Sequence, residues 1–239
     1  MTGERPPAGV PTAAAQPLGP ALGPALVAEA IGTFILVFAG CGAIAIGSLP
    51  PAGVAAAFGL AIMVSVYAFG HVSGAHFNPA VTAAMAIGRH FPIERVLAYW
   101  IAQAAGAISA AEFLRLTLGA GPLGVTQPAG SDPQAFAWET VLTFVLVLVI
   151  VAVATDSRAV GQGAAIAIGG AVALGSLVGG PISGASMNPA RSLGPAVVAG
   201  NLAHLWVYLA APFLGAALAV VVYRYLRAGV PGQPAGPRP

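Results

Sequence analysis

The most restrictive feature of this sequence is the length of its uncharged stretches. No Asp, Glu, Lys or Arg occurs from Ala30 to Gly88. Only 7% of the 239 residues are charged, against roughly 25% in an average soluble domain. Since about 20 consecutive apolar residues cross a bilayer core as a helix, this stretch alone can hold more than one crossing. The sequence therefore predicts an all-α membrane protein that crosses the bilayer several times.

Charge and cysteine content exclude several kinds of partner. The nine basic residues are all Arg and are dispersed, and the net charge is only +2, whereas a nucleic-acid surface needs a clustered basic face. The single cysteine, Cys41, lies in an apolar run and offers no disulfide or metal-ligand pattern. We therefore expect no nucleic acid, no metal and no cofactor.

The two ends of the chain differ in composition from its body. Residues 1–24 and 228–239 are rich in Pro and Gly, a composition that cannot bury enough apolar surface to fold. We predict a disordered tail at each end and a channel domain over residues 25–227.

Hydropathy divides this domain into long and short apolar segments. Two short segments, 78–88 and 188–199, begin at Asn-Pro and cannot cross, which is typical of re-entrant half-helices. Six segments have the length of a membrane crossing: 25–47, 52–72, 96–118, 138–155, 161–180 and 202–226.

The chain also repeats itself. AEAIGTFILV, from Ala28, returns as WETVLTFVLV, from Trp138, and SGAHFNPA at 73–80 returns as SGASMNPA at 183–190. The offset is constant at 110 positions (139 − 29 and 188 − 78). Repeat one is 25–118 and repeat two is 135–227. Three crossings are an odd number, so the second repeat must enter the membrane in the opposite orientation.

The positions of the arginines predict the topology of the inverted repeat. Only Arg115 borders the side opposite to the tails. By the positive-inside rule both termini are cytoplasmic, and we expect a multi-pass protein of the cell membrane. The arginines on the side of the tails are Arg5, Arg89, Arg95, Arg158, Arg224, Arg227 and Arg238.

The repeated Asn-Pro-Ala turns are the strongest candidates for a pore. Asn is a favoured N-cap, and Pro at the first helical position lacks the N–H that would stay unpaired. In an inverted repeat the two half-helices meet near the midplane with their positive ends, which repels cations and leaves small neutral solutes. The alternative is that both Asn residues only cap buried helices. The two motifs are Asn78, Pro79, Ala80 and Asn188, Pro189, Ala190.

Three charged residues lie inside the predicted membrane segments. Arg191 follows the second motif and, as an expensive intramembrane charge, is assigned to the pore wall; the alternative is an ion pair with a carboxylate. Glu29 and Glu139 occupy equivalent positions of the two repeats. We expect them to be structural buried acids that accept hydrogen bonds from the re-entrant loops; the alternative is proton coupling in a secondary transporter. A third class, an intramembrane hydrolase, would need Ser73 and His71 as nucleophile and base.

These motifs resemble the aquaporin, or major intrinsic protein, family. The resemblance rests on AEAIGTF, GHVSGAHFNPAVT at 70–82 and ISGASMNPARSLGPA at 182–196, and it covers essentially all of 25–227. It implies six helices with two half-helices, one pore per subunit, a homotetramer and a passive channel for water and small neutral solutes rather than an enzyme.

The resemblance also implies a four-residue selectivity filter: Phe58, Ser176, Ala185 and Arg191. Strict water channels usually carry His at the position of Ser176, so a small Ser176 and Ala185 imply a wider opening. GASMNPARSLGPA, with Ser192 and Ala196, is similar to the nodulin-like intrinsic proteins, which pass glycerol and uncharged metalloid acids. Phe58 departs from that group, which more often has Trp, Ala or Gly there.

Overall fold

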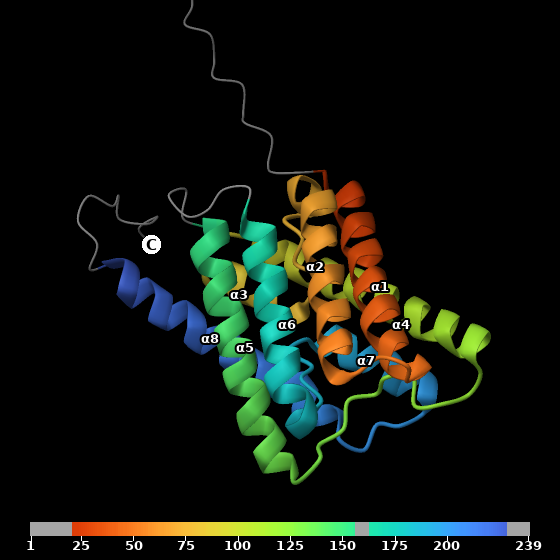
Figure 1. Ribbon diagram of the computed structural model, residues 1–239. Coiled ribbons are helices and arrows are strands. Elements are labelled where there is room, and N and C mark those ends of the chain that lie inside the picture. Colours follow the sequence, from red (N-terminus) through yellow and green to blue (C-terminus); the bar gives the residue numbers. More distant parts are fainter. Residues whose placement is uncertain (1–20, 156–162, 229–239) are drawn as a thin grey trace, which may run out of the picture.

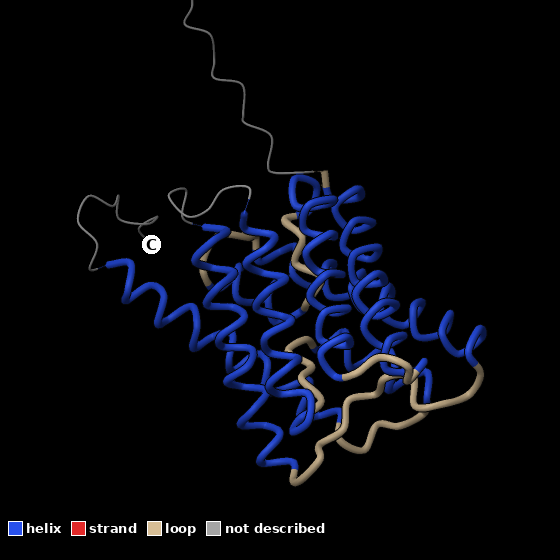
Figure 2. The backbone as a smooth tube through the Cα atoms, viewed as in Figure 1, coloured by secondary structure: helices blue, strands red, loops and turns tan. Residues whose placement is uncertain are grey.

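The computed structural model describes residues 21–155 and 163–228, and helix is the only regular secondary structure in these ranges (Figures 1 and 2). Six helices are long and apolar enough to cross a membrane, which confirms the predicted all-α fold with six crossings. The elements are α1 (Leu22–Ile46), α2 (Pro51–Ser73), α3 (Pro79–Ile87), the 3₁₀ turn η1 (Ile93–Arg95), α4 (Val96–Leu118), α5 (Asp132–Thr155), α6 (Ala164–Ser183), α7 (Pro189–Ala199) and α8 (Leu205–Ala228).

The predicted tail at the N-terminus is too long by three residues. Helix α1 begins at Leu22, not at residue 25. Pro24 does not prevent this, because the first backbone N–H groups of a helix have no partner within it. At the other end, α8 includes Ala228. Residues 1–20 and 229–239 of the predicted tails lie outside the described residues.

The packing of the helices follows the sequence repeat. Helix α1 packs on α4 as α5 packs on α8, and α2 packs on α6 between the halves. The chain therefore folds as two three-crossing units of opposite direction, each with one half-helix (Figure 1). The starts of α1, α4 and α6 face the same side as the ends of α2, α5 and α8.

Glycines at equivalent positions allow the helices to approach closely. A Cβ on Gly106 would lie 2.1 Å from the carbonyl oxygen of Ala30, and a Cβ on Gly215 would lie 2.2 Å from that of Thr140. Between the halves, a Cβ on Gly169 would lie 2.6 Å from the carbonyl oxygen of Gly59. Small residues are the usual means by which helices associate in lipid, where no hydrophobic driving force holds them together.

The half-helices α3 and α7 begin at Pro79 and Pro189, as predicted, and have nine and eleven residues. Both are too short to cross the bilayer. Their first residues are buried, and α3 packs on α4 and α8 while α7 packs on α4, α8 and α1. Each therefore starts inside the protein, where the preceding non-helical loop is shielded from lipid.

The crossing of α2 and α6 gives a test of the packing. Gly169→Ala should lower the midpoint of thermal unfolding of the purified protein, because its Cβ would meet backbone and overpacking costs about 1–3 kcal/mol. Gly170, its neighbour in α6, has nothing within 4 Å of an added Cβ. Gly170→Ala should therefore leave the midpoint unchanged or raise it. Equal midpoints for the two variants would contradict a backbone contact at this crossing.

Candidate pore

Hydrogen bonds to Glu29 hold the first re-entrant loop in place. One oxygen of its carboxylate accepts hydrogen bonds from Ser73 Oγ (2.7 Å) and the backbone N–H of His76 (2.9 Å). The other accepts from the backbone N–H of Phe77 (2.6 Å) and from Gln103 Nε2 (2.8 Å). Glu29 is fully buried. Both carboxylate oxygens are therefore occupied by donors that fix the loop.

Glu139 does the same for the second loop. It accepts from Ser183 Oγ (2.7 Å) and from the backbone N–H groups of Ser186 (2.9 Å) and Met187 (2.7 Å). In the structure, both glutamates thus accept hydrogen bonds from the re-entrant loops. Without such an acceptor, each of these N–H groups would destabilise the folded protein in lipid by several kcal/mol.

The same hydrogen bonds point backbone carbonyls into the interior between the loops. In a trans peptide the N–H of one residue points opposite to the C=O of the residue before it. Since the N–H groups of His76 and Phe77 point at Glu29, the carbonyls of Ala75 and His76 point away from it. Ala75 and Phe77 adopt left-handed backbone conformations (φ 53° and 50°), as do Ala185 and Met187 (43° and 53°) in the other loop.

The two Asn residues join the loops at their meeting point. Asn78 Nδ2 donates to the carbonyl of Met187 (2.7 Å), and Asn188 Nδ2 donates to the carbonyl of Phe77 (2.8 Å). Each Oδ1 caps its own half-helix by accepting from Ala80 N (2.9 Å) or Ala190 N (3.0 Å). The Asn residues therefore cap the half-helices, as the Asn-Pro-Ala motifs predict. Each Asn also keeps a second amide hydrogen that a solute can accept.

A cavity runs along this meeting point and contains both Asn residues and all four predicted filter residues. Its volume is about 60 Å³, which is enough to hold water, since one water needs about 10–15 Å³ by this measure. Its lining combines apolar side chains of the long helices with residues of the two re-entrant loops and Arg191. The lining residues are Leu36, Phe58, Ile62, Gly74, Ala75, His76, Asn78, Val81, Met85, Leu146, Ile150, Ala154, Ile168, Val172, Ser176, Ala185, Ser186, Met187, Asn188 and Arg191.

Arg191 is held at the wall of this cavity. Its Nη1 donates to the carbonyl of Gly124 (2.8 Å), and its guanidinium carbon lies 4.8 Å from the ring centroid of Phe58, within the range of a cation–π interaction. Arg191 is 1% exposed, and the ion pairs within 21–155 and 163–228 do not include it. The ion pair considered as an alternative from the sequence is therefore absent from the described residues. The sequence carries no signal that marks Gly124 as its acceptor.

Two polar atoms at the same place have no protein partner. Ser176 Oγ and Arg191 Nε are both buried and form no hydrogen bond among the described residues. An unpaired buried donor is costly, and here both atoms belong to residues that line the cavity. The residues line the cavity, but these two atoms have almost no surface open to a water-sized molecule.

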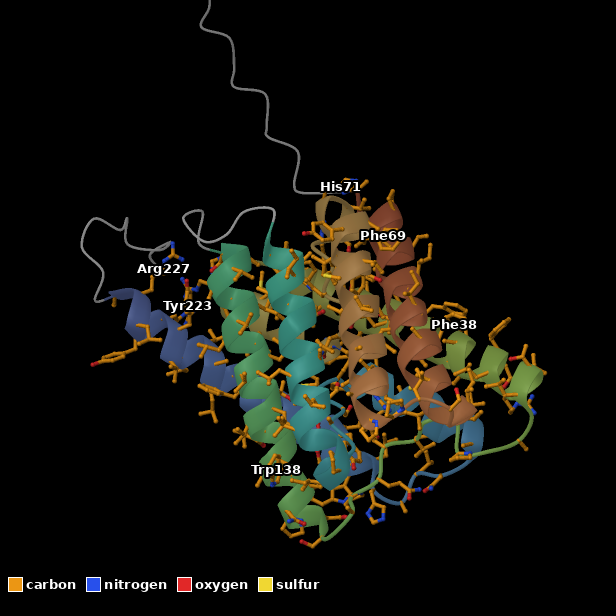
Figure 3. The ribbon with its side chains drawn as sticks, viewed as in Figure 1. Phe38, Phe69, His71, Trp138, Tyr223 and Arg227 are labelled. Carbon is orange, nitrogen blue, oxygen red and sulfur yellow. The ribbon has the colours of Figure 1, made fainter. Side chains whose placement is uncertain are left out.

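The candidate nucleophile and base of a hydrolase do not come together. Ser73 Oγ donates to Glu29 and accepts from the backbone N–H of Ala75 (3.0 Å). His71 is exposed near the end of α2 (Figure 3). The described residues also hold no cluster of potential metal ligands.

A wider vestibule of about 720 Å³ opens on the side where α1 begins. It shares Gly74 and His76 with the pore cavity and is also lined by His90 and Arg95. Burial lowers the pKa of His90, and the positive charges of Arg227 and Arg224 lower it further. The pore cavity thus has a broad mouth on this side, with a mixed apolar and polar lining.

Six crossings, two half-helices that meet inside the protein and a cavity between them define a membrane channel. The chain matches the profile of the family described as "Major intrinsic protein" over residues 20–223, and it belongs to this family. It is 50% identical over 209 residues to "Aquaporin NIP1-1" of Oryza sativa subsp. japonica (84% of this chain, 74% of the relative). It is 48% identical over 209 residues to "Nodulin-26" of Glycine max (84% and 77%).

Solved structures agree with this assignment. The fold superimposes on the X-ray structure of the aquaglyceroporin from Plasmodium falciparum with a TM-score of 0.74 and 25% sequence identity. The match covers 85% of this chain and 96% of that one. The chain is therefore a passive channel for water and small neutral solutes, as the resemblance predicted.

The glutamate anchors give a second test. Glu139→Gln should lower the midpoint of thermal unfolding and the water permeability, because the amide NH₂ must face at least one N–H or O–H donor of the loop. A buried donor without an acceptor costs about 1–3 kcal/mol. Glu112→Gln is the matched control, since the side chain of Glu112 is exposed and pairs with Arg115 on its own helix. If both variants keep wild-type values, Glu139 does not anchor the loop.

Proposed function

We propose that this chain passes water and neutral solutes of glycerol size, and that Phe58, Ser176, Ala185 and Arg191 select among them. The observation that carries the proposal is that all four residues line one cavity, in which the Arg191 guanidinium lies 4.8 Å from the ring centroid of Phe58. A small polyol has hydroxyls on one edge and carbon on the other. This lining matches both edges.

On this proposal, three side chains set the width of the filter. Ala185 is the smallest chiral side chain, and Ser176 is small. Phe58 limits the width from the third corner, where its ring lies so close to α1 that a Cβ on Gly40 would be 2.0 Å from it. These residues favour slender solutes over bulky metalloid acids.

Exclusion of protons and cations would come from the half-helices. The N-termini of α3 and α7 meet at Asn78 and Asn188, and each contributes about half a positive charge. Arg191 adds a full charge one turn further along α7. A cation would meet this field after losing its water, while a neutral solute would not.

Passive transport is favoured over proton coupling by the contacts of the two glutamates. A proton carrier must exchange its proton with water during transport. Glu29 and Glu139 are absent from the lining of the pore cavity, and all their carboxylate oxygens accept hydrogen bonds from the loops. The proposal therefore assigns them a structural role and assigns the chain no enzymatic activity.

For location and assembly, we propose a homotetramer in the cell membrane with both termini in the cytoplasm. The described arginines support this orientation: Arg89, Arg95, Arg224 and Arg227 lie on the side where α1 begins, and Arg115 lies on the other. The apolar side chains exposed on α2 and α6, among them Leu60 and Leu174, would face lipid or a neighbouring subunit.

The filter assignment is tested by narrowing it. Ser176→His together with Ala185→Thr should reduce glycerol flux into proteoliposomes about tenfold or more, while water flux falls by less than about twofold, because bulk at two corners excludes the larger solute first. Swelling is measured in the same vesicles with each solute. Ala210→Thr, on the exposed face of α8, is a control for the added hydroxyl. Ser176→His alone avoids the strain of a β-branched Thr at the left-handed Ala185 position (φ 43°), and equal losses of both fluxes in this single variant would show that the filter lies elsewhere.

The charge of Arg191 is tested separately. Arg191→Val should admit small cations, measured as conductance across a planar bilayer, because the fixed positive charge at the constriction is gone. Arg115→Val removes an exposed arginine and should leave the bilayer non-conducting. A non-conducting Arg191→Val channel with normal water flux would count against this role.

A further inference from the structure

The first turns of the two half-helices are secured by different parts of the chain. In repeat one, Gln103 of α4 donates from Nε2 to Thr82 Oγ1 (3.0 Å) as well as to Glu29. His76 Nδ1 lies 3.1 Å from the same hydroxyl. The first turn of α3 is thus tied to a long helix that crosses the membrane.

Helix α8 has no such side chain for α7. Tyr99 of α4 and Tyr208 of α8 donate in the same way to the carbonyls of Ser73 (2.9 Å) and Ser183 (2.6 Å). They are 109 positions apart (208 − 99), as are Gly106 and Gly215 (215 − 106). The residue 109 positions after Gln103 is Pro212, whose ring can donate no hydrogen bond.

In repeat two the missing donor comes from the loop that joins the repeats. Ser192 occupies the position of Thr82 (192 − 82 is 110). Thr126 Oγ1 donates to Ser192 Oγ (2.7 Å), which lies 2.5 Å from Ser186 Oγ. Ser186 Oγ in turn donates to the carbonyl of Asn188 (2.8 Å). A chain of hydroxyls thus leads from the loop to the cap of α7.

The same loop holds the guanidinium of Arg191. Loop 119–131 runs along the face opposite to the one where α1 begins (Figure 1). Two residues before Thr126, the carbonyl of Gly124 accepts from Arg191 Nη1 (2.8 Å). Three residues after it, the backbone N–H of Ala129 donates to the carbonyl of Ile182 (3.0 Å). Thr126 lies between these two points, is 6% exposed, and is absent from the lining of the pore cavity.

We propose that Thr126 is a positioning residue for the filter: its bond to Ser192 fixes the loop, so that the Gly124 carbonyl keeps the Arg191 guanidinium at the wall of the constriction. This inference rests on the proposed role of Arg191. Without the bond, the guanidinium loses its fixed acceptor and enters the lumen more often. The effective width for solutes larger than water then decreases.

Thr126→Val tests this, because Val keeps the shape of Thr and removes only the hydroxyl. The ratio of glycerol to water permeability, measured in the same proteoliposomes, should fall about fivefold, the change that the loss of one neutral hydrogen bond produces. The ratio does not depend on how much protein is folded. Thr126→Ser restores the hydroxyl and should restore the ratio. Thr117→Val is the control, since the hydroxyl of Thr117 bonds within its own helix to the carbonyl of Phe113 (2.7 Å).

Amide hydrogen exchange of the full-length protein provides a readout that does not depend on transport. In Thr126→Val, exchange should become faster in residues 123–126 and in the first turn of α7, and remain unchanged in the first turn of α3, which Gln103 holds. Unchanged exchange in α7, or an unchanged permeability ratio, would overturn the inference while leaving the channel function intact. A wild-type protein that passes neither solute would contradict the proposed function, and exchange alone would then decide on the Thr126 contact.

Discussion

The structure depends on the requirement that non-helical backbone inside a bilayer must find hydrogen-bond partners within the protein. Two re-entrant loops break the helices at this depth, and Glu29 and Glu139 accept the N–H groups that the loops leave unpaired. Because every N–H turned toward a glutamate turns a carbonyl the other way, the anchoring of the loops also creates the polar wall of the pore. Stability and permeation thus arise from the same few peptide groups.

The two repeats use different residues to secure the first turns of their half-helices. Repeat one uses an amide from a membrane helix, Gln103, whereas repeat two has Pro212 at that position and uses the hydroxyl of Thr126 from a surface loop. Arg191, a residue of the proposed filter, lies in repeat two. If Thr126 has the proposed positioning role, the loop between the repeats belongs to the selective region, although it lies outside the sequence motifs that define the family.

Much of the fold was predictable because each element obeys a local rule. Hydropathy located the six crossings, and the Asn-Pro caps located the starts of α3 and α7 to the residue. The four filter positions came from the family resemblance, and the structure brings them to one cavity. Gly124, Thr126 and Gln103 could not be found in this way, because their partners are distant in sequence and no local pattern marks them. Of the three, Gln103 alone stands out in the sequence, because it is a polar side chain in an apolar segment.

The unpartnered atoms Ser176 Oγ and Arg191 Nε have a consequence for the stability of the fold. Both are enclosed by protein without a hydrogen bond, at a cost of about 1–3 kcal/mol for each. Two residues that line the cavity therefore lower the stability of the protein, and the packing and loop anchors elsewhere must offset this cost.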